Sequence, residues 1–443
     1  MPVSRARAAA FDILSRVERE SSYASELLHS AAYKNLSLPD HALTTELVMG
    51  VLRWRSVLDY KISQASSQAI EKLDLEVLIA LRMGVYSFGW LTRIPKRAAL
   101  HESVELVKQA RKRSAAPFVN AVLRKLSTES LRSPVPSLVS HQALADSYAH
   151  PEWLVKRWMQ PYGSAATQLI CSHNQSIPAT TLRLRTPEAS TELDAQGITL
   201  APGSLLTTAR RVQSGDVTKA EAVRKGHAVI QDEASQLIAA LVGPHRERVL
   251  DCCAAPGGKT LAIADLNPDA AITAVEIHGH RARAMQKRFP ADSRIRIIVG
   301  DARALPLSRG YDSILADVPC SGTGTLARNP EIKWRLDPND LSKLHDRQVA
   351  ILRSAIAHLA PGGRLIYSTC SLEEEENEDV VEEVVKNEPQ LNVLDCGREL
   401  DQMKSAGTLI WPNPASLIRG PYLRTVPGVH PCDGFFAAIL ERS

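Results

Sequence analysis

Long apolar runs are missing from this sequence of 443 residues. No stretch approaches the about 18 consecutive apolar residues that a membrane-spanning helix needs. The N-terminus, Met1-Pro2-Val3-Ser4-Arg5, also lacks an apolar segment followed by a cleavage-like site. We therefore expect a cytoplasmic protein that does not associate with a membrane.

Cysteine is scarce and poorly arranged for cross-linking. The seven cysteines are an odd number, and no two form a Cys-x-x-Cys pair. This spacing argues against a disulfide framework and against a structural zinc site, so we expect no metal. Most of these thiols should be buried as small apolar side chains. Cys320 and Cys370 need the separate explanation given below.

Charge is ordinary in total but uneven along the chain. The net charge is +4, and residues 1–140 hold 20 Lys plus Arg against 13 Asp plus Glu. A chain of this length exceeds what one hydrophobic core usually supports, so several domains are expected. A basic first domain favours a nucleic-acid-facing module joined to a second, near-neutral one, although a solvated helix surface would give the same surplus.

The first part of the chain has a helical pattern. Apolar residues recur at three- and four-residue steps from about residue 5 to 126, with breaks near Pro39 and Pro95. This predicts an all-helical bundle. Residues 81–95, 101–108 and 118–126 resemble the NusB-like RNA-binding fold, which implies RNA contact through basic residues. The basic residues in question are Arg93, Lys96, Arg97, Lys108, Arg111, Lys112 and Arg113.

A poorly specified middle part follows. Residues 131–148 contain Pro134, Pro136 and several serines, which is typical of a linker. A short helix is expected from Pro151, and residues 180–185 alternate as a strand does. We predict a small α+β module that links the two larger domains.

After Gly226 the pattern changes to strands alternating with helices. Strands are predicted at 249–250, 271–276, 295–299, 311–316 and 364–367, with helices at 259–266, 281–289 and 341–359. This alternation is typical of a Rossmann-like α/β domain with a mostly parallel, doubly wound sheet. Ligands of such sheets bind at the carboxyl ends of the strands.

A glycine loop marks the first such strand end. Residues 251–260 read Asp-Cys-Cys-Ala-Ala-Pro-Gly-Gly-Lys-Thr, and Glu276 falls 19 residues beyond Gly257. A phosphate-binding P-loop requires glycine where Cys253 stands, and the Gly-x-Gly-x-x-Gly pattern of dinucleotide sites is also absent. We therefore disfavour an ATPase and a dehydrogenase.

S-adenosyl-L-methionine (AdoMet) fits this loop better, because it offers ribose hydroxyls and an adenine but no phosphate. Glu276 is predicted to bind the ribose, and Asp301 to lie near the adenine. The alternative for each acid is a cap on a helix or loop.

Two cysteines follow strands of the same predicted sheet, Cys320 after 311–316 and Cys370 after 364–367. Carbon 5 of a pyrimidine is a poor nucleophile, so its methylation requires prior attack on carbon 6. A thiolate suits that attack, and a second thiol helps release the product. Either cysteine alone could be an inert buried thiol; the pair favours catalysis.

Three motifs carry a resemblance to a known family. Residues 251–260, 317–325 with 329–335, and 367–371 with 376–378 resemble RNA cytosine-C5 methyltransferases. With the helical first domain and the ending 433–438, the chain is similar to the bacterial ribosomal RsmB/Fmu (Sun) type. Aspartate is common in that family where Glu276 stands.

The resemblance implies that Cys370 is the nucleophile, that Cys320 assists release, and that Asp317 touches the target base. The site residues that we expect are the catalytic Cys370 and Cys320 and the cofactor-binding Cys253, Ala254, Ala255, Pro256, Gly257, Gly258, Lys259, Glu276, Asp301 and Asp317. A base that leaves its stack favours an RNA loop or junction over a perfect duplex. Arg328, Lys333 and Arg335 are candidates to hold its phosphates.

We thus predict three domains: a NusB-like helical domain (1–140), a linking α+β module (141–241) and an AdoMet-dependent methyltransferase domain (242–443). The predicted reaction forms 5-methylcytosine in small-subunit (16S) ribosomal RNA, by a protein that acts as a monomer. One alternative is a non-catalytic RNA-binding factor of the antitermination type. Another is an amino-group methyltransferase, which needs no thiol.

Overall fold

The computed structural model describes residues 3–20, 22–129, 131, 140–289 and 294–443. The chain divides into two compact units. Unit 1 is Met1–Ile177 with Leu326–Arg335, and unit 2 is Pro178–Thr325 with Leu336–Ser443. The division into three domains stays a prediction.

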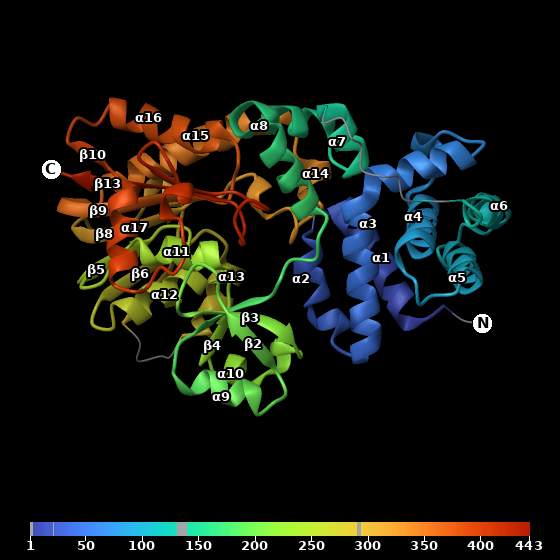
Figure 1. Ribbon diagram of the computed structural model, residues 1–443, viewed down its shortest axis with the longest axis horizontal. Coiled ribbons are helices and arrows are strands. Elements are labelled where there is room, and N and C mark those ends of the chain that lie inside the picture. Colours follow the sequence, from blue (N-terminus) through green and yellow to red (C-terminus); the bar gives the residue numbers. More distant parts are fainter. Residues whose placement is uncertain (1–2, 21, 130, 132–139, 290–293) are drawn as a thin grey trace. The chain divides into compact units, whose positions relative to one another are not determined.

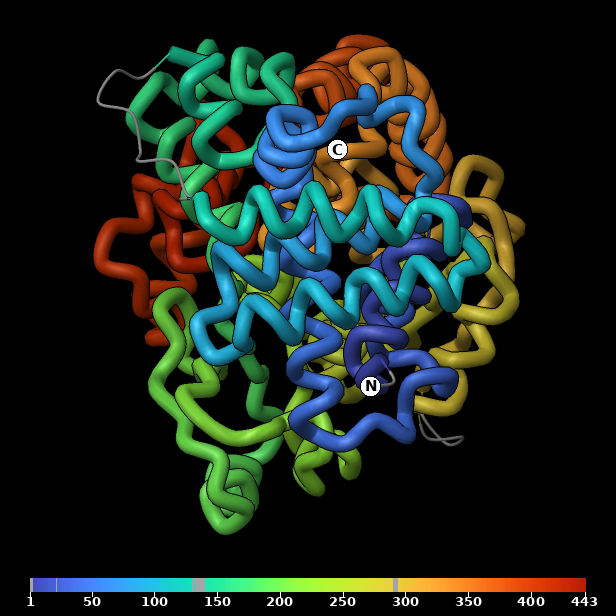
Figure 2. The backbone as a smooth tube through the Cα atoms, turned by 90° about the vertical axis from the view of Figure 1, so that its right-hand side faces the viewer, coloured from blue at the N-terminus to red at the C-terminus, as the bar shows by residue number. Residues whose placement is uncertain are grey.

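Unit 1 is helical throughout its described part, as the sequence pattern predicts (Figure 1). Its helices α5 and α6 run side by side in Figure 2. The α-helices of unit 1 are α1 (Arg5–Glu20), α2 (Ala24–Leu28), α3 (Leu38–Ala65), α4 (Leu75–Trp90), α5 (Lys96–Gln109), α6 (Ala116–Leu126), α7 (His141–Ser147), α8 (Glu152–Asn174) and α14 (Ile332–Arg335).

The predicted apolar spacing produces the core of this bundle. In α3, Leu47 and Val51 are buried one turn apart, and in α4 the same holds for Leu81 and Val85. Side chains at such steps lie on one face of a helix. The middle of both helices is enclosed on every side, because residues 47–53 of α3 and 77–87 of α4 are all buried.

The predicted linker, 131–148, is only partly a linker. Pro134 and Pro136 lie outside the described residues, but its second half forms helix α7, which Ser140 caps by accepting a hydrogen bond from the Ala143 N–H at 3.1 Å. The helix expected from Pro151 is followed directly by a second one, because the backbone of α8 breaks at Gly163, where φ is 75°, before it continues to Asn174.

The segment Leu326–Arg335 belongs to unit 1 although unit 2 precedes and follows it in sequence. The Lys333 ammonium donates to the carbonyls of Arg53 at 3.0 Å and Ala149 at 2.8 Å, and its side chain is 1% exposed. Burial lowers the pKa of Lys333 well below its ordinary value. The prediction that Lys333 holds RNA phosphates is therefore wrong: the lysine cross-links backbone inside the helical unit.

Unit 2 begins with a small antiparallel sheet of order β2-β3-β1-β4 (Figure 1). β1 covers the strand expected at 180–185, whereas residues 141–177 of the predicted α+β module belong to unit 1. The elements of this part of unit 2 are β1 (Thr181–Leu184), α9 (Glu188–Asp194), β2 (Thr199–Pro202), β3 (Ala209–Ser214), α10 (Glu221–Arg224) and β4 (Ala228–Ile230).

The large sheet of unit 2 has the order β11-β12-β13-β9-β8-β5-β6-β7, with β10 paired to β13. Strands β9, β8, β5, β6 and β7 are parallel neighbours, which confirms the Rossmann-like prediction. Its elements are α11 (Glu233–Ala240), β5 (Arg248–Asp251), α12 (Gly258–Leu266), β6 (Ala271–Glu276), α13 (Gly279–Gln286), β7 (Ile295–Val299), β8 (Tyr311–Asp317), α15 (Pro338–Ile356), β9 (Leu359–Thr369), α16 (Glu378–Lys386), β10 (Leu391–Leu394), α17 (Cys396–Ser405), β11 (Ile418–Arg419), β12 (Tyr422–Thr425) and β13 (Phe435–Arg442).

Helices cover both faces of this sheet (Figure 1). Because side chains alternate along a strand, Val249 of β5 packs in one cluster with α11, α12 and α17, whereas its neighbour Leu250 packs in another with α15 and α16. Ile366 and Leu365 of β9 divide in the same way. Both faces are largely apolar and buried, and the acids Glu276 and Asp317 lie at strand ends.

The long helix differs in its bounds from the prediction of 341–359. It begins at Pro338, because Asp337 and Asp340 form a capping box, and it ends at Ile356, since β9 already starts at Leu359. No helix in the described part of the chain is long and apolar enough to cross a membrane.

Substituting Gly324 should distort the loop that follows β8. Its N–H donates to the Cys370 carbonyl at 2.9 Å, and a Cβ there would lie 2.2 Å from the Gly434 carbonyl oxygen. Because two backbones meet at this point, we expect Gly324→Ala to lower the free energy of unfolding by about 2 kcal/mol or more, measured by urea denaturation. Gly279→Ala, where the nearest atom lies at 3.4 Å, is the control and should stay within about 0.5 kcal/mol. Equal values for the two variants would contradict the prediction.

Candidate functional site

The site predicted from sequence lies at the carboxyl ends of the parallel strands. Glu276 ends β6, Asp317 ends β8, Asp301 follows β7, and Cys370 follows β9. The strands are hydrogen-bonded neighbours in the order β9-β8-β5-β6-β7, so these ends share one edge of the sheet.

The glycine loop joins β5 to α12 at that edge. Its Ala254 N–H donates to the Val275 carbonyl of β6 at 2.9 Å, which ties the loop to the neighbouring strand. Gly257 precedes α12 with φ of 95°, a left-handed conformation that a side chain disfavours. The loop therefore presents backbone rather than bulky side chains before the helix N-terminus.

The two acids expected to bind the cofactor differ in their surroundings. Glu276 is buried, and its Oε1 accepts from the His278 N–H at 2.7 Å. Asp301 accepts from the Arg303 N–H at 2.9 Å and forms an ion pair with the Arg303 guanidinium. These hydrogen bonds lower the pKa of Asp301. Asp301 thus caps a short turn, the alternative considered from sequence, while Glu276 is the more enclosed acid.

The two thiols meet. Cys320 Sγ lies 3.2 Å from Cys370 Sγ and accepts from the Cys370 N–H at 3.3 Å. This confirms the prediction that the two cysteines lie close together. Their strands are parallel neighbours, and Asp317 of β8 pairs with Ser368 of β9 directly before the two loops.

Cys320 is the thiol whose ionisation is opposed. The hydrogen bond with Cys370, burial, and the negative charges of Cys370 and Glu376 raise the pKa of the Cys320 thiol well above its ordinary value. Two thiols this close do not both ionise, because the second charge would face the first.

Asp317 stands between two donors beside the thiols. Lys259 Nζ donates to its Oδ2 at 2.7 Å, and Ser368 Oγ donates to its Oδ1 at 2.8 Å. Burial acts against the Lys259 ammonium, but the charge and hydrogen bond of Asp317 outweigh it and raise the pKa of Lys259. The lysine predicted as a cofactor contact therefore forms an ion pair with Asp317.

Asp251, at the end of β5, is a buried acid. Its Oδ2 accepts from the Thr260 hydroxyl at 2.7 Å, whereas its Oδ1 has no partner of good geometry within the described residues. Burial raises the pKa of Asp251 to about 7, although the Thr260 hydrogen bond acts in the opposite direction. Oδ1 is an acceptor that a ligand amino group would satisfy.

Family models match three parts of the chain. Residues 239–441 match the 16S rRNA methyltransferase RsmB/F model, residues 4–128 the NusB family, and residues 150–217 the ferredoxin-like domain of RsmF/B-like methyltransferases. A probable ribosomal RNA small subunit methyltransferase B of Bacillus subtilis is 31% identical over 458 residues, which cover 100% of both chains. The ribosomal RNA small subunit methyltransferase B of Klebsiella pneumoniae is 31% identical over 422 residues, 92% of this chain and 91% of that one.

The chain belongs to the RsmB/F family of 16S ribosomal RNA methyltransferases. It is accordingly a methyltransferase of small-subunit ribosomal RNA. This answers the alternative of an RNA-binding factor without catalysis.

Solved structures have the same fold. The crystal structure of the protein PH0851 covers 99% of this chain and 98% of its own with a TM-score of 0.79 at 22% identity. A methyltransferase homologue from Pyrococcus horikoshii covers 68% of this chain and 99% of its own, with a TM-score of 0.57 at 23% identity. The fold therefore recurs at low identity.

Sequence reasoning did not find every polar residue of this RsmB-type site. Ser368 and the buried Gln348 of α15 had no assigned role, and Glu376 was noted only as part of a motif. Ser368 had a signal: it is a polar residue at the carboxyl end of β9, where ligands of such sheets bind. Gln348 had none, because a single amide in a long helix is usually exposed.

The basic residues of the NusB-like part are partly paired. Lys108 lies 2.6 Å from Glu105 and Lys112 lies 3.0 Å from Asp74.

Among the residues described, no group of three or more His, Cys, Asp or Glu is arranged to hold a metal ion.

Asp251 should make the free energy of unfolding of unit 2 depend on pH. Its pKa is about 7 in the folded protein against 3.8 ordinarily, so the folded state keeps a proton that the unfolded chain has released. Stability then falls as pH rises from about 4 to about 7. Without cofactor, the stability of Asp251→Asn relative to wild type should increase by about 2 to 3 kcal/mol between pH 5 and pH 8, measured by urea unfolding.

The control for this shift is Asp269→Asn, which changes an exposed carboxylate between α12 and β6. Its stability relative to wild type should not depend on pH over the same range. A pH-independent difference for Asp251→Asn would mean that Asp251 is already ionised at pH 5.

Proposed function

We propose that this RsmB-type protein transfers a methyl group from AdoMet to carbon 5 of a cytosine in 16S ribosomal RNA, through a covalent bond between Cys370 and carbon 6. The observation that carries the proposal is the 3.2 Å approach of Cys320 and Cys370 at the ends of two neighbouring strands. A methyltransferase that acts on an amino group or ribose hydroxyl has no use for paired thiols.

The chemistry assigned to Cys370 is nucleophilic attack. Its thiolate bonds to carbon 6, and the electron pair of the 5,6 double bond makes carbon 5 nucleophilic. Carbon 5 would then take the methyl group of AdoMet as the bond from that carbon to the sulfonium sulfur breaks, and the sulfur would keep the electron pair as a neutral thioether. Loss of the carbon 5 proton returns the electron pair to the ring, and the bond between Cys370 and carbon 6 breaks.

Cys320 suits the second half of this sequence. While Cys370 is anionic, its charge keeps the proton on Cys320. Once Cys370 has bonded to carbon 6, that charge is gone, and Cys320 releases its proton to solvent more readily. The resulting thiolate is the base that we assign to removal of the carbon 5 proton.

Asp317 supports the choice of cytosine. Each carboxylate oxygen has two lone pairs, so both can accept a further donor in addition to Lys259 and Ser368. Cytosine presents an exocyclic amino group, which such a carboxylate accepts; uracil presents a carbonyl oxygen, which it repels. We therefore assign Asp317 to the target base.

AdoMet, when bound, supplies an electrophilic methyl group on a sulfonium. We assign the backbone of residues 253–259 and the carboxylates of Glu276 and Asp301 to its binding. The unpaired Oδ1 of Asp251 fits this assignment, since it is a buried acceptor beside the same loop. RNA contact through the basic residues of the NusB-like part, a monomeric state and a cytoplasmic location belong to the same proposal.

The two cysteine variants should fail in different ways. Cys370→Ala should abolish turnover, since no other group is assigned to attack carbon 6. Cys320→Ala should still attack and then accumulate a protein–RNA adduct that survives denaturing electrophoresis. Transfer of labelled methyl groups to ribosomal RNA and bisulfite sequencing of that RNA measure the product.

The matched control is Cys396→Ala, which removes a buried thiol of α17. It should keep turnover and form no stable adduct. If Cys370→Ala methylates normally while Cys320→Ala cannot attack, the two roles are reversed. Formation of 5-methylcytosine by both variants would rule out the covalent mechanism.

A further inference from the structure

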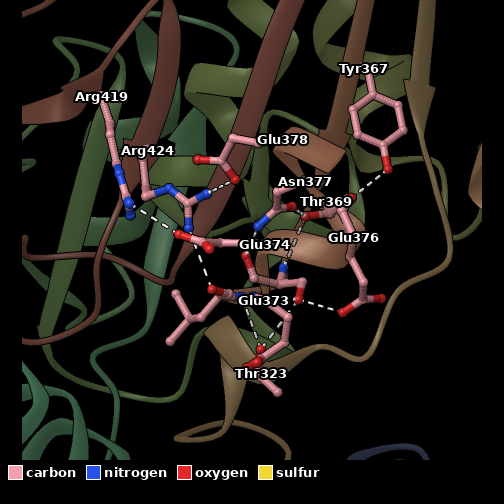
Figure 3. Close-up of polar contacts among 12 residues, drawn as sticks. Thr323, Tyr367, Thr369, Glu373, Glu374, Glu376, Asn377, Glu378, Arg419 and Arg424 are labelled. Carbon is pink, nitrogen blue, oxygen red and sulfur yellow. Dashed lines mark hydrogen bonds and ion pairs between the residues drawn. The ribbon is translucent and has the colours of Figure 1, made fainter. Parts of the chain in front are cut away.

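An acidic turn follows Cys370, and its three members have different surroundings. The turn is Glu374–Glu376, which leads into α16. Glu374 is exposed and forms an ion pair with Arg419 at 3.0 Å. Glu376 is 0% exposed. Figure 3 shows Glu374 directed toward Arg419 and Glu376 directed away from it.

The Glu376 carboxylate bonds to the residue that follows each cysteine. Its Oε1 accepts from the Ser321 N–H at 2.8 Å, and its Oε2 accepts from the Ser371 hydroxyl. Ser321 follows Cys320 and Ser371 follows Cys370. One side chain therefore connects the two loops that carry the thiols.

Gln348 of α15 completes this contact from a third element. Its amide nitrogen donates to Glu376 Oε1 at 2.9 Å and to the Pro319 carbonyl at 3.0 Å. Both Gln348 and Glu376 are fully buried. The Cys320 loop is thus held on both sides of the cysteine, at Pro319 and at Ser321.

Further hydrogen bonds link the same two loops. Ser371 Oγ lies 3.0 Å from Ser321 Oγ, and Thr323 Oγ1 accepts from the Leu372 N–H at 2.9 Å. The Asn377 side chain donates to the Ser371 carbonyl at 3.0 Å. Figure 3 shows Thr323, Glu376 and Asn377 around this cluster.

A buried carboxylate is costly unless donors surround it, and here three donors do. An apolar side chain of similar size would fill the space but would bond to neither loop. Position 376 thus needs a side chain with two acceptor oxygens. One accepts from the Cys320 loop and the other from the Cys370 loop.

We propose that Glu376 is a positioning residue for this RsmB-type methyltransferase: it holds the Cys320 and Cys370 loops together so that the two sulfur atoms stay in contact. The catalytic consequence rests on the proposed function, because it assumes that both thiols act on the same base. The contact between the two sulfur atoms does not depend on the proposed function.

The decisive variant is Glu376→Gln, which keeps the shape but replaces one acceptor oxygen by an amino group. The value of kcat for methyl transfer should fall by about 100-fold, as expected for reacting groups displaced by an ångström. The KM for RNA and the Kd for AdoMet should stay within about twofold, since Glu376 is not assigned to bind either. A general loss of folding would change all three.

A second measurement reports the sulfur geometry without RNA or AdoMet. Hydrogen peroxide oxidises two adjacent thiols to a disulfide, taking two electrons and two protons and forming two molecules of water. The disulfide between Cys320 and Cys370, quantified by peptide mass spectrometry, should form about tenfold more slowly in Glu376→Gln than in wild type, because the sulfur atoms must close from 3.2 Å to about 2 Å.

Glu374→Gln is the matched control, since it removes an exposed carboxylate from the same turn. It should leave kcat and the rate of disulfide formation unchanged. Ser371→Ala removes one of the two links and should reduce both quantities in the same direction by a smaller factor. This variant keeps the test available if Glu376→Gln does not fold.

Wild-type kcat and a wild-type rate of disulfide formation in Glu376→Gln would overturn the proposal. A parallel loss of AdoMet affinity and kcat would also overturn it, since the residue would then be structural. The oxidation result remains valid if the cytosine chemistry is wrong: failure of Cys370→Ala to lose activity refutes the proposed function, whereas an unchanged oxidation rate refutes the role of Glu376.

Discussion

The site depends on the register between β8 and β9. Asp317 pairs with Ser368 in this parallel ladder, and the chain then leads on each side to a cysteine. A slip of one residue would move one loop by about 3.3 Å and would turn its side chains to the opposite face of the sheet. Either displacement exceeds what a 3.2 Å sulfur contact tolerates. The apolar clusters on both faces fix this register, because β8 and β9 each place alternate residues in the two clusters.

Charge at the strand ends is organised around the same two strands. Lys259 is paired with Asp317, so the lysine and the acid can both remain charged in a largely enclosed place. The Cys320 thiol faces the Cys370 sulfur and the Glu376 carboxylate, which keep its proton bound. Asp251, one strand away, is fully buried, and burial raises its pKa to about 7 although the Thr260 hydrogen bond and the Lys259 charge act in the opposite direction. Asp317 and Asp251 thus differ in their surroundings: Asp317 has an ion-pair partner, whereas burial favours the protonated form of Asp251.

Much of this could be predicted from sequence, for identifiable physical reasons. Period-two and helical patterns gave the order of strands and helices from 249 to 367, and motifs at strand ends meet because parallel strands end at one edge. The antiparallel strands β10–β13 were not predicted, since several are short and lie among turns. Lys333 was misjudged because a basic residue between Ile332 and Trp334 gives no sign of being buried against the carbonyls of Arg53 in α3 and Ala149 between α7 and α8. Glu376 was hidden in a run of four glutamates, which normally indicates a solvated turn.

Lys333 and Glu376 illustrate one structural device in the two units. Each is a long ionisable side chain that is fully buried and bonded to main-chain groups far away in sequence: Lys333 to the carbonyls of Arg53 and Ala149, and Glu376 to the Ser321 N–H. Burial of such groups gains little stability compared with apolar packing. Its benefit is geometric, because a hydrogen bond specifies a distance and a direction, whereas apolar contact specifies neither. A reaction that needs two sulfur atoms beside one base depends on that specification more than on additional stability, which is why an acid rather than a leucine suits position 376.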